Sequence, residues 1–159
     1  MKQSLSILAF AITLSLASQV YAGSQVDYPE GYRNWTHIKS MLIEPGHPLE
    51  NPFQGLHHVY GNDKALEGLK SGNYTDGSVL VFDLLSYKQG GKAIQESTRK
   101  LVGVMVKDAN NFKSTGGWSF EGFAGDSKSK RLVGDGSTGC YSCHTSQANS
   151  DFVFTKMRK

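Results

Sequence analysis

Residues 78–87, SVLVFDLLSY, are the clearest strand-forming stretch of the sequence, because apolar, branched and aromatic side chains dominate it. The tetrapeptide QGGK (89–92) follows as the tip of a predicted hairpin. RKLVGVMVKD (99–108) then returns as an antiparallel partner. These three segments predict an antiparallel sheet at the centre of the domain.

The segments on either side add further elements. FQGLHHVY (53–60) predicts a strand, and GGWSFEGFAGD (116–126), with its alternating aromatic residues, predicts another. A short helix is expected in between, with Asn62 or Asp63 as its N-cap and Gly72 as its stop.

The segment DYPEGYRNWTHIKSMLI (27–43) carries Tyr32, Trp35 and Ile38 at helical spacing. It therefore predicts a short N-terminal helix. Eighteen glycines, four prolines and 38% hydrophobic residues fit a compact fold with many turns. The predicted class is α+β, a mainly antiparallel sheet with short helices, one of them at the C-terminus.

The first 22 residues, MKQSLSILAFAITLSLASQVYA, have the features of a cleaved secretory signal peptide. Lys2 precedes an apolar run from Leu5 to Ala17, and Ala22 is a small residue at the predicted cleavage site. The run is shorter than the roughly 20 residues of a bilayer-spanning helix, so no membrane anchor is expected. We predict export to the periplasm and one mature domain, residues 23–159. The net charge of +3 is too small to indicate a nucleic-acid partner.

Both cysteines lie in GCYSCHTSQ (139–147). Cys140 and Cys143 are about one helical turn apart, so both thiols can form thioethers with the vinyl groups of one porphyrin. His144 then falls under the iron. C-x-x-C-H is the attachment pattern of c-type haem, and it predicts one covalently attached haem c with His144 as the metal ligand.

Two other uses of the motif compete with haem. A disulfide between cysteines two apart usually opens the first helix of a βαβ unit, whereas Cys143 is followed only by residues 144–159. A zinc site would need further ligands, and the sequence has neither a second cysteine pair nor a spaced histidine pair. Haem is the favoured interpretation.

The sixth position of the iron is expected to be open. Electron-transfer cytochromes c carry the motif near the N-terminus and a methionine ligand far downstream. Here the motif comes last, and Met157 is close to His144 in sequence. Met41 and Met105 remain candidate ligands, although methionine more often fills a core. An electron-transfer cytochrome therefore stays as an alternative.

The mature chain resembles the cytochrome P-460 and cytochrome c′-beta family over essentially its whole length. The resemblance rests on the order and spacing of YRNWTHI (32–38), DGSVLVFDL (76–84), VKDANNF (106–112), GGWSF (116–120) and C-x-x-C-H followed by SDFVFT (150–155). It implies a largely antiparallel sheet, unlike the four-helix-bundle cytochromes c′, and a homodimer. In the P-460 branch a haem-cross-linked lysine and a proton-handling glutamate serve hydroxylamine oxidation.

This sequence departs from that branch at both residues. Aligned on the DG turn, the lysine position holds Phe82, and aligned on V-K-D, the glutamate position holds Gly103. The sequence thus offers neither an amine for the cross-link nor a proton acceptor at these positions. Asp83 is adjacent, but strand alternation places it on the opposite face from Phe82. A hydroxylamine or nitric oxide oxidoreductase is the weaker alternative.

The c′-beta branch caps the distal haem face with two phenylalanines. Phe82 matches one, and Phe53, expected at the start of its strand, is the candidate for the other; ordinary sheet core is the competing interpretation of Phe82. His57 shares strand parity with Phe53 and is a candidate pocket-rim or propionate contact. A sixth iron ligand is a further alternative, and a surface or structural histidine is the leading one.

A phenylalanine cap excludes water and offers no hydrogen-bond donor, which disfavours bound oxygen. Nitric oxide and carbon monoxide bind ferrous iron mainly through the metal. We therefore predict a gas-binding cytochrome with five-coordinate iron and no catalytic residue. A redox partner is left open.

Overall fold

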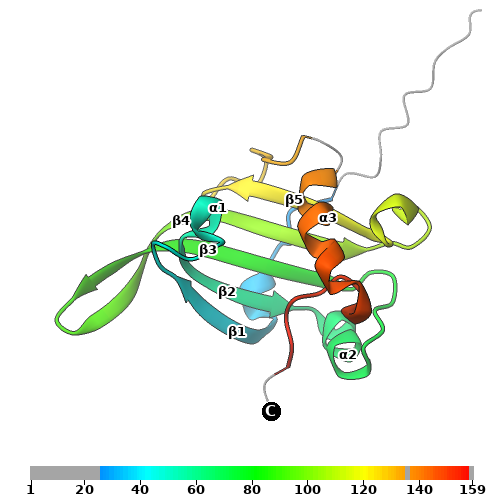
Figure 1. Ribbon diagram of the computed structural model, residues 1–159, viewed down its shortest axis with the longest axis horizontal. Coiled ribbons are helices and arrows are strands. Elements are labelled where there is room, and N and C mark those ends of the chain that lie inside the picture. Colours follow the sequence, from blue (N-terminus) through cyan, green and yellow to red (C-terminus); the bar gives the residue numbers. More distant parts are fainter. Residues whose placement is uncertain (1–25, 135–136, 158–159) are drawn as a thin grey trace, which may run out of the picture.

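The computed structural model describes residues 26–134 and 137–157 (Figure 1). The predicted signal peptide, residues 1–22, and the predicted mature start at Gly23 lie outside the described residues. Within them, no helix combines the length and apolar character needed to span a bilayer.

A five-stranded antiparallel sheet in the order β1-β2-β3-β4-β5 forms the centre of the molecule, as the sequence predicts. The strands are β1 (Thr36–Ile43), β2 (Gly55–Gly61), β3 (Val79–Gly90), β4 (Ala93–Lys107) and β5 (Trp118–Ala124). The helices are η1 (Tyr32–Asn34), α1 (Glu50–Phe53), α2 (Asp63–Ser71), η2 (Lys113–Thr115), α3 (Thr138–His144) and η3 (Thr145–Ser150).

The β3–β4 hairpin confirms the prediction from residues 78–108. The two strands pair from Val79 opposite Val106 to Gly90 opposite Ala93. Gly91 and Lys92 form the tip with φ values of 57° and 63°, and two left-handed central residues match the twist of a two-residue hairpin. The outer part of the hairpin projects beyond the other strands (Figure 1).

The two faces of the sheet are covered differently. Leu80 and Phe82 of β3 lie on the face covered by α2 and α3, which we call the helical face. Val81 packs with Tyr32 on the opposite back face, beneath the N-terminal segment. Period-two alternation along β3 produces this division. Figure 1 shows α1 and α3 in front of the strands and α2 beside the end of β2.

Helix α2 matches its predicted limits. The side chain of Asn62 accepts a hydrogen bond from the Ala65 amide at 3.0 Å, and Gly72 ends the helix with φ 81°. The same Asn62 oxygen also accepts the Val79 amide at 3.0 Å. The N-cap therefore ties α2 to the start of β3.

The predicted N-terminal helix is wrong. Only the three-residue turn η1 forms, and the chain continues as edge strand β1, paired with β2 from Thr36 opposite Gly61 to Ile43 opposite Gly55. The pairing has an irregularity between His37 and Lys39, which interrupts simple alternation. Pairing with β2 satisfies the backbone of this segment and outweighs its helical spacing.

The strand predicted from residue 53 begins at Gly55 instead. Phe53 is the last residue of the short helix α1, in a segment that the sequence suggests is irregular. Gly55 has φ 143°, and a Cβ there would lie 2.3 Å from the Leu85 carbonyl oxygen. The sharp entrance to β2 therefore requires glycine, and it sets Phe53 above the sheet rather than in it.

Candidate functional site

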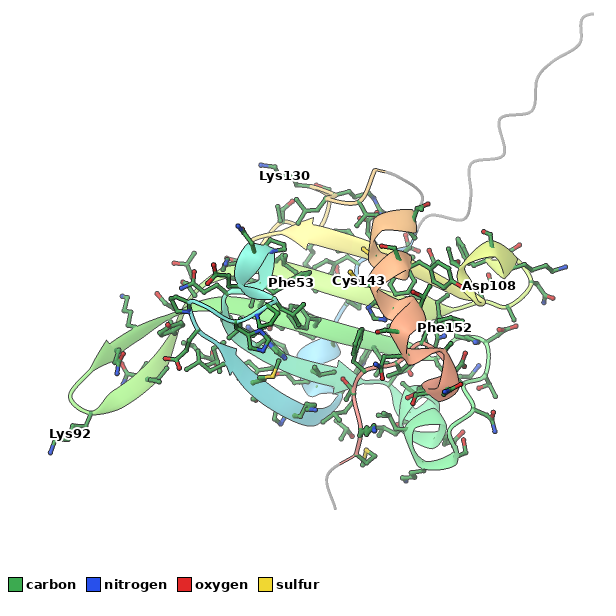
Figure 2. The ribbon with its side chains drawn as sticks, viewed as in Figure 1. Phe53, Lys92, Asp108, Lys130, Cys143 and Phe152 are labelled. Carbon is green, nitrogen blue, oxygen red and sulfur yellow. The ribbon has the colours of Figure 1, made fainter. Side chains whose placement is uncertain are left out.

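The C-x-x-C-H motif lies on α3, which crosses the helical face (Figure 1). Cys140 is partly buried and packs against the core cluster of this face, which also contacts Phe82. Cys143 is exposed (Figure 2). One short helix therefore presents both thiols and His144 above the same surface of the sheet.

Ser137 attaches the start of this helix to the sheet. Its hydroxyl accepts the Phe120 amide and donates to the Phe120 carbonyl, both at 2.9 Å. The residue is buried and adopts φ 78°, the left-handed region that a serine seldom enters. Two hydrogen bonds to one residue of β5 fix where α3 begins.

His144 is oriented by a backbone carbonyl. Its Nδ1 lies 2.7 Å from the Phe152 carbonyl oxygen. A carbonyl only accepts, so Nδ1 carries the proton and Nε2 keeps its lone pair. Burial lowers the pKa of His144 against the opposing effect of this hydrogen bond, which favours the neutral imidazole that a metal needs. Phe120 and Phe154 flank the ring, with centroids 4.8 and 5.0 Å away.

The segment after the motif is locked in place by an ion pair. Lys107 Nζ donates to both carboxylate oxygens of Asp151, at 2.7 and 2.8 Å. Phe152 follows with φ 63°, and its ring lies where a Cβ on Gly116 would be, 2.2 Å from Cε2. Lys107 and Gly116 thus position the carbonyl that orients His144, as second-shell groups commonly do at metal sites.

The structure brings the three predicted pocket residues together on the helical face. The Phe53 and Phe82 ring centroids are 5.6 Å apart at an edge-to-face angle of 78°. The His57 ring lies 4.4 Å from Phe82, tilted by 33°. Figure 2 shows Phe53 and Cys143 over the same side of the sheet, on α1 and α3. Phe53 from α1 and His57 from β2 therefore form a cluster around Phe82.

Lys100 supports the loop that carries Phe53. Its Nζ donates to the carbonyl oxygens of Gln54 at 2.6 Å and Pro52 at 3.3 Å. Of Lys88, Lys92 and Lys100, which the sequence places near the hairpin, Lys100 holds the backbone on both sides of Phe53. Its ammonium group is engaged by carbonyls.

Gly103 lies beside Phe82. The two residues are paired across β3 and β4, and Gly103 is paired in turn with Gly122 of β5. A Cβ added to Gly103 would lie 3.5 Å from the Phe82 Cβ, which is an ordinary van der Waals contact. The backbone therefore accommodates a side chain at this position, and packing alone does not impose glycine.

His57 is buried in an apolar environment. Burial, followed by electrostatic effects of His58 and Lys39, lowers the pKa of His57 to about 4. The imidazole is therefore neutral near pH 7. Its neighbour His58 points to the back face, where it contacts Ser40 and Glu96. As strand alternation predicts, only one of the adjacent histidines lies on the helical face.

A family model for cytochrome P460 matches residues 29–155. The chain belongs to the cytochrome P460 family. The match covers most of the described residues, and the sheet with few short helices agrees with it. No curated protein matches the chain. Membership makes the protein a haem-binding cytochrome.

The residues of the helical face fit a haem. His144 is held with Nε2 available, and Nε2 makes no hydrogen bond to any residue in 26–134 or 137–157. Cys143 is exposed beside it, and Phe154, half exposed, lies against the imidazole. The aromatic cluster around Phe82 provides an apolar surface on the same face. These features supply an axial ligand, attachment points and hydrophobic contacts.

A cavity of about 330 Å³ lies on the other side of the sheet. Back-face residues such as Val26, Trp35 and Val104 line it, and neither cysteine nor His144 does. The candidate haem site is therefore located by the motif and by the orientation of His144, on the helical face and away from this cavity.

Sequence reasoning missed the groups that orient the motif. Ser137 acts through its hydroxyl on the Phe120 backbone, Asp151 through its ion pair with Lys107, and Phe152 through its carbonyl. All three have left-handed backbone conformations. Only the resemblance of SDFVFT to the family pointed to the last two, and it assigned them no role.

Proposed function

We propose that the protein is an exported c-type cytochrome that binds or scavenges nitric oxide, and also carbon monoxide, at a five-coordinate haem iron. Cys140 and Cys143 would hold one haem per chain, and His144 Nε2 would ligate the iron. The contact between Phe53 and Phe82 carries the proposal, since it puts two aromatic rings together on the helical face. By the family resemblance, Phe82 stands at the position where the oxidising relatives carry a lysine.

Each residue has a defined task in this proposal. The Phe152 carbonyl keeps His144 in the tautomer that presents Nε2. Phe82 and Phe53 exclude water from the space above them and offer no hydrogen-bond donor. The haem supplies ferrous iron, which binds diatomic gases with little help from neighbouring groups. Positions 82 and 103 hold no amine or carboxylate to move protons, so the proposal includes no oxidation step.

The location and assembly are also proposals. The leader at residues 1–22 supports periplasmic export, and the family resemblance supports a homodimer. The mass of the exported chain should correspond to a start at Gly23 plus one haem, and sedimentation should give the mass of two chains. A retained leader or a monomer would contradict these two points separately.

The absorption spectrum of the ferrous protein tests the function. A five-coordinate high-spin spectrum that changes on adding nitric oxide is expected, because the distal side offers phenylalanine rings. A six-coordinate low-spin spectrum that does not change on adding nitric oxide would favour an electron-transfer cytochrome instead. A strongly red-shifted Soret band would indicate a lysine-modified haem and restore the oxidoreductase alternative.

Replacing Phe82 with alanine should speed carbon monoxide binding about tenfold or admit water to the iron, because the cap loses its central ring. Stopped-flow or flash-photolysis rates measure this change. Leu80→Ala is the matched control, since Leu80 is buried two positions earlier on the same face. Equal carbon monoxide binding rates in both variants and in the wild type would show that Phe82 is an ordinary residue of the sheet core and not a cap.

A further inference from the structure

His57 has an unsatisfied polar atom in a dry location. The residue is 4% exposed. Its Nδ1 is the one buried side-chain nitrogen or oxygen without a hydrogen-bond partner in the part of the chain that the structure describes. Leaving such a group unpaired is unfavourable, so a buried unpaired nitrogen indicates a partner that the described residues do not supply.

The surroundings narrow the partner down. On β3, the residue paired with His57 is Leu84, and on β1 it is Met41, so neither of the two directly paired residues offers a hydrogen-bonding side chain. The other close contact is the face of Phe82. The imidazole therefore belongs to the aromatic cluster around Phe82, the cluster that the proposed function assigns to the distal pocket.

The charge state of the ring is also defined. Burial is the main cause that lowers the pKa of His57, and electrostatic effects of His58 and Lys39 add to it, so the ring stays neutral near pH 7. A neutral imidazole carries one N–H donor and one acceptor nitrogen. It can thus donate a hydrogen bond to a ligand without bringing a buried charge into the pocket.

We propose that His57 donates a hydrogen bond to a small ligand held beneath Phe82, so that the pocket takes small anionic or polar ligands such as cyanide as well as nitric oxide and carbon monoxide. This inference rests on the proposed gas-binding function. The ligand pocket would then be apolar except for one polar contact, from His57, beside the phenylalanine cap.

The experiment uses the full haem-loaded protein with cyanide and carbon monoxide as probes. His57→Leu should weaken cyanide binding to the ferric protein about tenfold, the loss expected for one hydrogen bond of about 1.4 kcal/mol. The C–O stretch of the carbon monoxide complex should shift upward in His57→Leu and return toward the wild-type value in His57→Gln, whose amide still donates. Vibrational spectroscopy reports this contact independently of any activity.

His58→Leu is the matched control, because His58 is adjacent in sequence but lies on the back face. It should leave both measurements unchanged. Wild-type values in a folded, haem-loaded His57→Leu protein would overturn the proposal. So would a change confined to the reduction potential, which would make His57 a propionate contact.

Should His57→Leu fail to fold, the wild-type carbon monoxide complex still tests the proposal. Exchange into D₂O should shift its C–O stretch if an N–H donates to the ligand, and an absent shift would contradict the contact. If the wild-type protein binds neither nitric oxide nor carbon monoxide, that result would contradict the proposed function and, with it, this role of His57.

Discussion

A protein with both Cys140 and Cys143 replaced by serine is expected to lose all covalently bound haem. Each thiol can supply one thioether to the porphyrin, and a serine hydroxyl does not replace it. The intact mass of the wild-type chain should include one haem that survives acid-acetone extraction. The double variant should show the mass of the polypeptide alone.

Ser142→Ala controls for damage to the helix itself. Ser142 is exposed between the two cysteines, and its hydroxyl donates only to the Gly139 carbonyl at 2.8 Å. This variant should retain the full haem mass. Haem that extracts freely from the wild type would rule out covalent attachment, and haem retained by the double variant would show that other residues form the bond.

The central part of the fold could be predicted from local sequence. β3 and β4 are rich in strand-forming residues joined by a glycine-containing tip, and α2 has its own N-cap and C-cap, so these elements are specified by nearby residues. The segment 36–43 has helical spacing but becomes β1, because its backbone partners lie on β2. Long-range pairing of this kind leaves little trace in a local pattern.

The candidate site likewise combines features that follow from local sequence with features that depend on long-range contacts. Strand alternation correctly put only one of His57 and His58 on the helical face and Asp83 on the face opposite Phe82. Phe53 reached the cluster from α1 rather than from a strand, through the positive φ of Gly55. The support of His144 depends on the Phe152 carbonyl, and a backbone atom has no signature of its own in the sequence.

The second large effect is expected from Asp83, whose side chain is completely buried on the back face. Arg99 Nε donates to Oδ1 at 2.7 Å, Tyr32 OH to Oδ2 at 2.7 Å, and Arg33 to Oδ2 at 3.1 Å. Removing one member of a buried, hydrogen-bonded ion pair leaves the others uncompensated. Asp83→Ala should therefore lower the free energy of unfolding by about 3–5 kcal/mol, measured by urea denaturation.

Asp126→Asn provides the control, because Asp126 is the second carboxylate paired with Arg99 and its side chain is exposed. Exposed pairs contribute about 0–1 kcal/mol, so this variant should unfold close to the wild-type midpoint. A similar small loss in Asp83→Ala would show that Tyr32 and Arg99 find other partners, and that the buried pair does not hold the N-terminal segment.

The pH dependence of the wild type against Asp83→Asn tests the charge itself. Burial alone would raise the pKa of Asp83, but the hydrogen bonds from Arg99, Tyr32 and Arg33 outweigh it and hold the pKa below its ordinary value of 3.8. A carboxyl whose pKa is lower in the folded state stabilises the fold above the unfolded value and loses that effect as pH falls. The stability difference between the two proteins should thus be constant from about pH 7 to 5 and shrink below about pH 4, where protonated Asp83 comes to resemble asparagine. A difference that stays constant down to pH 2 would mean that the negative charge contributes nothing to this cluster.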